Sequence, residues 1–415
     1  MKVAVVAEFY PRRGDPVLGI WAHRQALAAR EAGAEVRVLV LHRLVPPQSA
    51  LSAGPAPSAR AMCALLSQPH REARDGIEVA YVRYLSPPRG RAYHAWGAWA
   101  APALALALRA LRRGFRFDLI HAHNAIPAGD AVRRARLRAP LAISVHGGDV
   151  LYTAPRSPAG RRAVERNLSA AAVVLANSHG IAELARSYGA RDTRVVHLGS
   201  DLPFARSHAG SDLPLARSHP GGDRPRPTHP RERRGASLVT VGHLVARKRH
   251  ADVIRALAVL APRHPTLRYA IVGDGPERVA LEGLAARLRV GERVDFHGQL
   301  PHEQAIALAR ECTLFAMPST EEAFGVAYVE AMAGGVPAIG CRGEPGPEEI
   351  AAAGDGFVLV PPGDIERLTQ RIDELLSDPQ RLREVSRRAR ETVAAHFTWE
   401  QCGQRTVAAY RDALR

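Results

Sequence analysis

Residues 313–337 constrain the fold of this chain more than any other stretch. Residues 313–317 are apolar and precede Pro318, which predicts a short buried strand that ends there. Residues 326–333 have the apolar spacing of a helix, which Gly334 and Gly335 end. A polar turn joins the two elements, so the stretch predicts a strand-turn-helix unit of an α/β fold.

The start of this helix can bind an anion. Its first N–H groups, near Phe324, Gly325 and Val326, have no partner inside the helix, and the glycine allows close approach. Glu322 precedes these amides and Glu330 follows them, so a ligand centred on the helix start can meet a carboxylate on either side. Carboxylates accept hydrogen bonds from paired hydroxyls. The pattern indicates a nucleoside-diphosphate sugar, with a diphosphate between two hydroxyl-rich rings.

The same stretch resembles the Glu-x7-Glu signature of retaining glycosyltransferases of family 4, which have the two-domain GT-B fold. The flanking Pro-Ser, the Glu-Ala-Met-Ala helix and the Gly-Val-Pro exit fit that signature as well. The resemblance implies that Glu322 contacts the donor sugar, that the amides of residues 324–326 hold the diphosphate, and that Glu330 holds the ribose. The alternative is an ordinary strand-turn-helix unit with two solvated glutamates.

The length of 415 residues predicts more than one domain. With the resemblance, it leads us to expect an α/β protein with two Rossmann-like domains facing a cleft. The expected parts are an acceptor-side domain at 1–200, a Pro/Gly/Arg-rich linker at 201–236, a nucleotide-sugar-binding domain at 237–396 and a helix at 397–415 that crosses back to the first domain. At the start of the linker, residues 199–209 and 210–220 repeat an 11-residue pattern, which indicates a flexible link or a slipped duplication rather than a solenoid.

The first half of the chain contains several expected elements. Residues 2–7 predict a buried strand and residues 19–31 a helix, and Gly19 stands where the family has a glycine loop that faces the cleft and the donor. Residues 44–75 lack periodicity, which predicts a long surface loop with one short helix near Met62. Residues 93–108 are apolar but too short for a membrane span, so we expect a packed helix.

Two further predicted strands end in histidines. His121 and His123 close one strand, and His146 with Asp149 follows the next. Because the carboxyl ends of parallel strands line the ligand crevice, these side chains are expected to converge there. One hypothesis is a zinc-dependent hydrolase that uses His121, His123 and His146. The other follows from the resemblance, in which His146 lies beside the donor sugar.

The second half opens with a strand and then a basic turn. Arg247, Lys248 and Arg249 stand where a helix begins and can neutralise a diphosphate leaving group. The family has Gly-Arg-Leu-x-x-x-Lys here, so Lys248 matches its lysine, while His243 replaces its arginine and Arg247 is expected to substitute for it. The chain has no Asp-x-Asp pair to hold a donor-bound metal. We therefore expect no metal and no other cofactor.

Positive charge gathers in the first half. The net charge is +16, of which residues 1–200 carry +15, while residues 237–415 carry −2. This asymmetry predicts an anionic partner, which is a membrane surface, a lipid-linked or otherwise anionic acceptor, or nucleic acid, unless an arginine-rich coding bias has coated the surface. We expect no nucleic acid, because no aromatic residues are interleaved on a strand face. No signal-peptide pattern follows Met1, so a cytoplasmic protein, peripheral on the inner face of the membrane, is expected.

Overall fold

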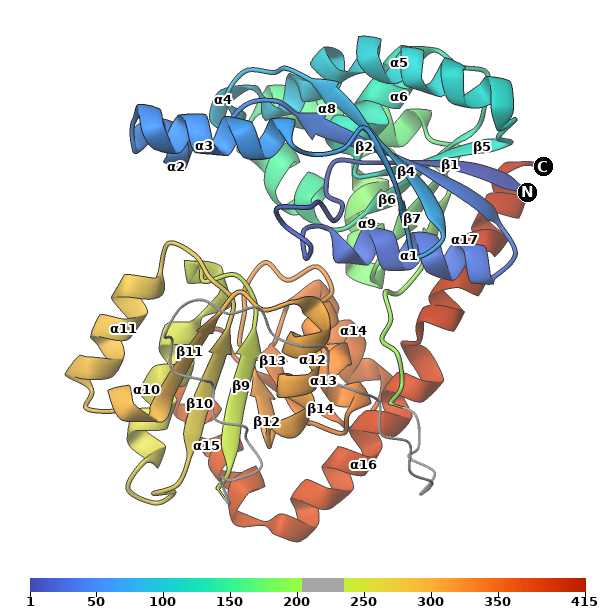
Figure 1. Cartoon of the computed structure of the whole chain (residues 1–415). Coiled ribbons are helices and arrows are strands. Elements are labelled where there is room, and N and C mark those ends of the chain that lie inside the picture. The colour runs from blue at the N-terminus through green and yellow to red at the C-terminus, as the bar shows by residue number, and fades with distance from the viewer. Residues whose placement is uncertain (204–234) are drawn as a thin grey trace, which may run out of the picture.

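Two sheets, each covered by helices on both faces, make up this protein in a computed structural model that describes residues 1–203 and 235–415 (Figure 1). We call residues 1–200 the N-terminal half and residues 237–396 the C-terminal half. The sequences of most strands are continuous apolar runs, as expected where both faces of a parallel sheet are buried. The expected class, two Rossmann-like α/β units, is confirmed.

The sheet of the N-terminal half has eight strands in the order β3-β4-β2-β1-β5-β6-β7-β8. They are β1 (Lys2–Ala7), β2 (Glu35–Arg43), β3 (Arg71–Arg74), β4 (Ile77–Tyr84), β5 (Leu119–His123), β6 (Leu141–Val145), β7 (Val173–Ala176) and β8 (Thr193–Val195). Only the pairing of β3 with β4 is antiparallel among them.

Helices cover both faces of this first sheet. α1 packs on one face, together with α17 from the end of the chain, and α5, α6, α8 and α9 pack on the other. The helices are α1 (Ile20–Glu31), α2 (Gln48–Ser52), α3 (Pro55–Leu66), α4 (Arg89–Ala92), α5 (Trp96–Gly114), α6 (Asp130–Ala135), α7 (Ala154–Arg156), α8 (Pro158–Ala170) and α9 (His179–Ser187).

The sheet of the C-terminal half is parallel throughout, in the order β11-β10-β9-β12-β13-β14. Its strands are β9 (Ser237–Val241), β10 (Arg268–Val272), β11 (Val294–Gly298), β12 (Leu314–Ala316), β13 (Ala338–Cys341) and β14 (Phe357–Val360). Its helices are α10 (His250–Leu260), α11 (Arg278–Arg287), α12 (His302–Glu311), α13 (Val326–Ala333), α14 (Pro345–Ala353), α15 (Ile365–Ser377) and α16 (Pro379–His396).

The last helix, α17 (Trp399–Ala413), returns to the N-terminal half and lies beside α1 (Figure 1). A capping box at Thr398 starts it, and Gly403 lets it approach α1 so closely that a Cβ there would lie 2.1 Å from the carbonyl oxygen of Ala28. Tyr410 also reaches the first sheet, with its hydroxyl 2.6 Å from Nδ1 of His121. α17 therefore connects the end of the chain to the N-terminal half.

The long loop expected at residues 44–75 is wrong, whereas the helix expected near Met62 is present. The supposed loop at residues 44–75 contains α2, α3 and β3, and α3, which includes Met62, is a helix of 12 residues. None of the residues of α2 or α3 is buried, so these helices lie on the surface and pack no apolar stripe into a core. The expected packed helix at 93–108 is α5, which runs further, to Gly114.

None of the helices in the described part of the chain is long and apolar enough to cross a membrane. The sequence repeat at 199–220 lies outside the described residues from position 204 onward, as does most of the expected linker.

Candidate active site

Neighbouring strands bring two loops of the C-terminal half together. β9 and β12 pair in parallel, with Leu238 opposite Leu314 and Val239 opposite Phe315. The basic turn after β9 and the polar turn after β12 therefore leave the same edge of the sheet, which in open α/β sheets is where ligands bind. This edge faces the N-terminal half across a cavity of about 840 Å³.

Both halves of the molecule line this cavity. The N-terminal half contributes aromatic, basic and glycine residues, and the C-terminal half contributes an arginine and the polar turn after β12. The lining includes Phe9, Trp21, Arg89, Tyr93, His146, Gly147, Tyr152, Arg156, Arg247, Glu321, Glu322 and Ala323. Of the predicted site residues, His146, Arg247 and Glu322 thus share one cavity.

The Glu322 carboxylate is buried and paired with cations. Lys248 donates to its Oε2 at 2.6 Å, Ser319 Oγ donates to the same oxygen at 2.9 Å, and Arg247 lies 3.9 Å away. Burial alone would raise the pKa of Glu322, but the charge and hydrogen bond of Lys248, with Arg247 and Ser319, hold it below its usual value. Glu322 is therefore an ionised carboxylate beside two cations, on the cavity wall.

The turn that follows Glu322 depends on Gly325. This residue caps α13 in the left-handed region, at φ +87°, and a Cβ there would lie 2.3 Å from the ring of Tyr328. The Phe324 side chain points away from solvent and packs against the rings of His197 and Phe397. Helix α13 begins at Val326, as predicted.

Glu330 lies on α13 and has a different partner. Nε2 of His302, at the start of α12, lies 2.7 Å from its Oε1, while Arg310 donates to its backbone carbonyl. Burial lowers the pKa of His302, but the hydrogen bond and charge of Glu330 outweigh burial and leave that pKa above its ordinary value. The sequence analysis missed His302, since nothing marks this helix-opening histidine as a partner of a residue 28 positions later.

His146 approaches the cavity from the other half. It follows β6, its Nε2 lies 2.9 Å from Nδ1 of His123, and its ring meets that of Trp21 at 6.2 Å. Burial lowers the pKa of His146 to about 4, so its imidazole is neutral near pH 7. A Cβ at the next residue, Gly147, would lie 2.4 Å from Cβ of Ala323, so the two halves touch beside Glu322.

The other residues of the expected histidine cluster have structural partners. His121 uses both ring nitrogens, toward Ser144 Oγ at 2.8 Å and toward Tyr410 at 2.6 Å. The Asp149 carboxylate accepts the backbone N–H groups of Ala125 and Ile126. The rings of His121 and His123 do lie together, with centroids 4.5 Å apart, and His123 also contacts His146. In the described part of the chain, however, no three of these side chains bring ligand atoms within 4.8 Å of one another, which disfavours the metal-dependent hydrolase.

Gly19 shapes the loop before α1. It lies in the left-handed region at φ +64°, and a Cβ there would lie 2.1 Å from the carbonyl carbon of Phe9. This close contact places Phe9 and Trp21 on the cavity wall. The glycine that the sequence singled out is thus adjacent to cavity residues.

Basic residues that the sequence analysis did not single out also line the cavity. The Arg89 guanidinium lies over the ring of Tyr93 at 4.2 Å, and Arg156 is exposed at the end of α7. Tyr152 donates to the carbonyl of Glu321 in the other half. They lie in segments without regular periodicity, and only their convergence in space reveals them.

Two family models match the chain, "Glycosyl transferases group 1" over residues 225–392 and "Glycosyl transferase 4-like domain" over residues 19–199. The sucrose-phosphate synthase of Thermosynechococcus elongatus has a similar structure, with a TM-score of 0.74 and 22% identity, over 99% of this chain and 98% of that one. HepE of Anabaena, in complex with UDP and glucose, is similar over 99% of both chains, with a TM-score of 0.69 and 21% identity.

A curated relative also matches. The GDP-mannose-dependent alpha-(1-6)-phosphatidylinositol monomannoside mannosyltransferase of Mycolicibacterium smegmatis is 33% identical over 175 residues, which are 40% of this chain and 46% of that protein. The chain spans less than half the length of the curated relatives it matches. It belongs to the group 1 glycosyltransferases and has the GT-B fold. This membership does not favour a nucleic-acid-binding protein either.

Proposed function

We propose that this protein is a glycosyltransferase that moves a sugar from a nucleoside-diphosphate sugar to an acceptor, with retention at the anomeric carbon. The observation that carries the proposal is the buried Glu322 carboxylate, paired with Lys248 and Arg247 on the cavity wall just before the start of α13. The family membership and the UDP and glucose named for HepE support this donor class. Retention follows from the resemblance to family 4.

The donor diphosphate binds to cations and to helix amides in this proposal. The N–H groups near Phe324, Gly325 and Val326 favour an anion at the start of α13. Lys248 and Arg247 stand beside them, and their fixed charges stabilise the leaving diphosphate as the bond to the sugar breaks. Side chains thus neutralise the leaving group, so the reaction needs no metal.

The donor's two rings meet a carboxylate each. Glu322 accepts hydrogen bonds from hydroxyls of the transferred sugar. His146, as a neutral imidazole, approaches the same sugar from the N-terminal half. Glu330 accepts hydrogen bonds from the ribose hydroxyls through Oε2, because His302 contacts its other oxygen, Oε1. Gly19 keeps the loop before α1 clear of the donor.

The acceptor in this proposal is anionic and enters from the N-terminal half. Arg89 and Arg156 line the cavity on that side, and residues 1–200 carry the excess positive charge. A lipid-linked acceptor at the inner face of a membrane fits both features, because cationic surfaces bind anionic headgroups.

A donor screen tests the proposal. The purified protein is mixed with UDP-sugars and GDP-sugars, with and without EDTA, and release of the free nucleotide is measured. We expect release from at least one donor, with similar rates in EDTA. Release from no donor by a protein that binds none of them would refute the glycosyltransferase. Loss in EDTA that magnesium restores would refute metal independence alone.

A further inference from the structure

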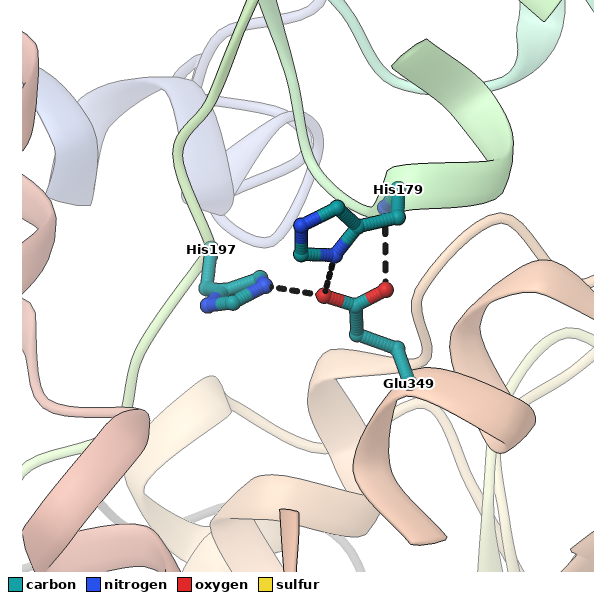
Figure 2. Close-up of side chains that lie close together, drawn as sticks. All are labelled: His179, His197 and Glu349. Carbon is teal, nitrogen blue, oxygen red and sulfur yellow. Dashed lines mark hydrogen bonds and ion pairs between the residues drawn. The ribbon is translucent and has the colours of Figure 1, made fainter. Parts of the chain in front are cut away.

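Two histidines of the N-terminal half meet one glutamate of the C-terminal half, away from the cavity that holds Glu322. His179 opens α9, His197 follows β8, and Glu349 lies on α14 (Figure 2). One ligand atom from each side chain lies within 4.8 Å of the other two. Among residues 1–203 and 235–415, no other three His, Cys, Asp or Glu side chains come together in this way.

Hydrogen bonds now join the three side chains. Nδ1 of His179 lies 2.5 Å and Nε2 of His197 lies 2.6 Å from the same oxygen, Oε1 of Glu349. One carboxylate oxygen therefore already lies between two imidazole nitrogens, as Figure 2 shows.

We propose that His179, His197 and Glu349 form a binding site for a zinc ion that joins the two halves. Two imidazole nitrogens and one carboxylate oxygen are ligands that zinc accepts, and water completes a tetrahedral site. With bonds of about 2 Å to the metal, tetrahedral ligand atoms stand about 3.3 Å apart. Each side chain therefore needs to shift by less than about 1 Å.

The surroundings hold the ligands in place. The backbone N–H of His179 donates to the second oxygen of Glu349 at 2.9 Å, which orients the carboxylate. The His197 ring stacks on Phe324 and meets the edge of Phe397, with centroids 5.9 and 5.2 Å away. The three side chains also line a second cavity, of about 680 Å³, through which an ion can enter. Such support around a ligand set strengthens metal binding.

Arg405 hinders zinc binding at His197. Its NH1 donates to Nδ1 of His197 at 3.0 Å, which leaves the ring proton on Nε2, the atom that faces Glu349. A zinc ion on Nε2 requires that proton on Nδ1, where it faces the guanidinium. The Arg405 side chain is exposed and can move away from His197. Substitution of Arg405 should therefore strengthen zinc binding.

Calorimetric titration of the full-length protein, dialysed against EDTA, with zinc chloride tests the proposal. We expect one tight site in the wild type, weakened by more than about 100-fold in Glu349→Gln and in His197→Gln. The matched control is His264→Gln, because His264 pairs with Asp373 at 2.8 Å without a third ligand. It should bind zinc like the wild type. A wild type without a single tight site, or a Glu349→Gln variant that keeps it, overturns the proposal.

Thermal unfolding supplies a readout that does not depend on the fit of the titration. Zinc should raise the melting temperature of the wild type and of His264→Gln, because a ligand that binds only the folded state stabilises it. The same zinc concentration should leave Glu349→Gln unchanged. An equal rise in all three proteins would mean that exposed histidines, and not this site, bind the ion.

Arg405→Gln provides the opposite change. An amide oxygen can accept the proton on Nδ1 of His197, so this variant should bind zinc about tenfold more tightly. Weaker binding than in the wild type would show that the proposed geometry at His197 is wrong.

Discussion

The two halves of the molecule build their sides of the cavity in different ways. In the C-terminal half, Glu322, Arg247 and Lys248 lie on two turns at the ends of adjacent strands. Each turn belongs to its own short sequence motif. The N-terminal half contributes residues from segments far apart in the sequence, such as Trp21 at the start of α1 and Arg89 at the start of α4. The proposed donor side therefore follows a local sequence pattern, whereas the residues of the proposed acceptor side are brought together only by the fold.

The largest expected effect tests the C-terminal side. Glu322→Gln removes the charge that Lys248 and Arg247 now balance, together with the proposed contact to the sugar. We expect kcat/KM to fall by about 100-fold to 1000-fold, as when a group that acts in the transition state is lost. Steady-state kinetics checks this, with the exposed Glu303→Gln as control. Wild-type kinetics in Glu322→Gln would break the proposed donor side.

Glu330→Gln should have a smaller effect on the same side. If Glu330 holds the ribose, the variant raises the donor KM by about tenfold, because a hydrogen bond to a charged group is lost. The value of kcat should change less, since the ribose does not react. The separate measurement of KM and kcat decides the matter, and a fall in kcat alone would exclude a ribose contact.

The pair of His302 and Glu330 gives the C-terminal half a pH dependence. Because the pKa of His302 is raised in the folded protein, the stabilisation is fully present below about pH 6.5 and is lost as the pH rises through the raised pKa. At pH 6 we expect wild type to exceed His302→Gln by about 1.5 kcal/mol in free energy of unfolding. Urea unfolding between pH 6 and 9 measures this. A gap that widens with pH would contradict the ion pair.

The smallest expected effect concerns the N-terminal half. With +15 on residues 1–200, the protein should sediment with anionic liposomes, because each basic residue near such a surface adds about 1 kcal/mol. Raising the salt should release it, since screening shortens the attraction to about 8 Å at physiological ionic strength. Neutral liposomes are the control. Indifference to anionic vesicles at low salt would favour the coding-bias explanation of the arginines.

The two-part α/β fold and the turn around Glu322 follow from local patterns along the chain. Buried parallel strands need apolar runs, and the turn into α13 needs at position 325 a residue that tolerates a positive φ, so both leave marks along the chain. The exposed helices α2 and α3 left no such mark, because they bury no stripe of side chains.

Which distant side chains meet depends on how the strands and helices pack. Lys248 reaches Glu322 because β9 and β12 pair side by side, and His302 reaches Glu330 because α12 packs on α13. The contact of Glu349 with two histidines of the other half likewise depends on how the halves dock. A side chain's partner across the fold depends on strand order and packing, and these leave no local pattern in the sequence.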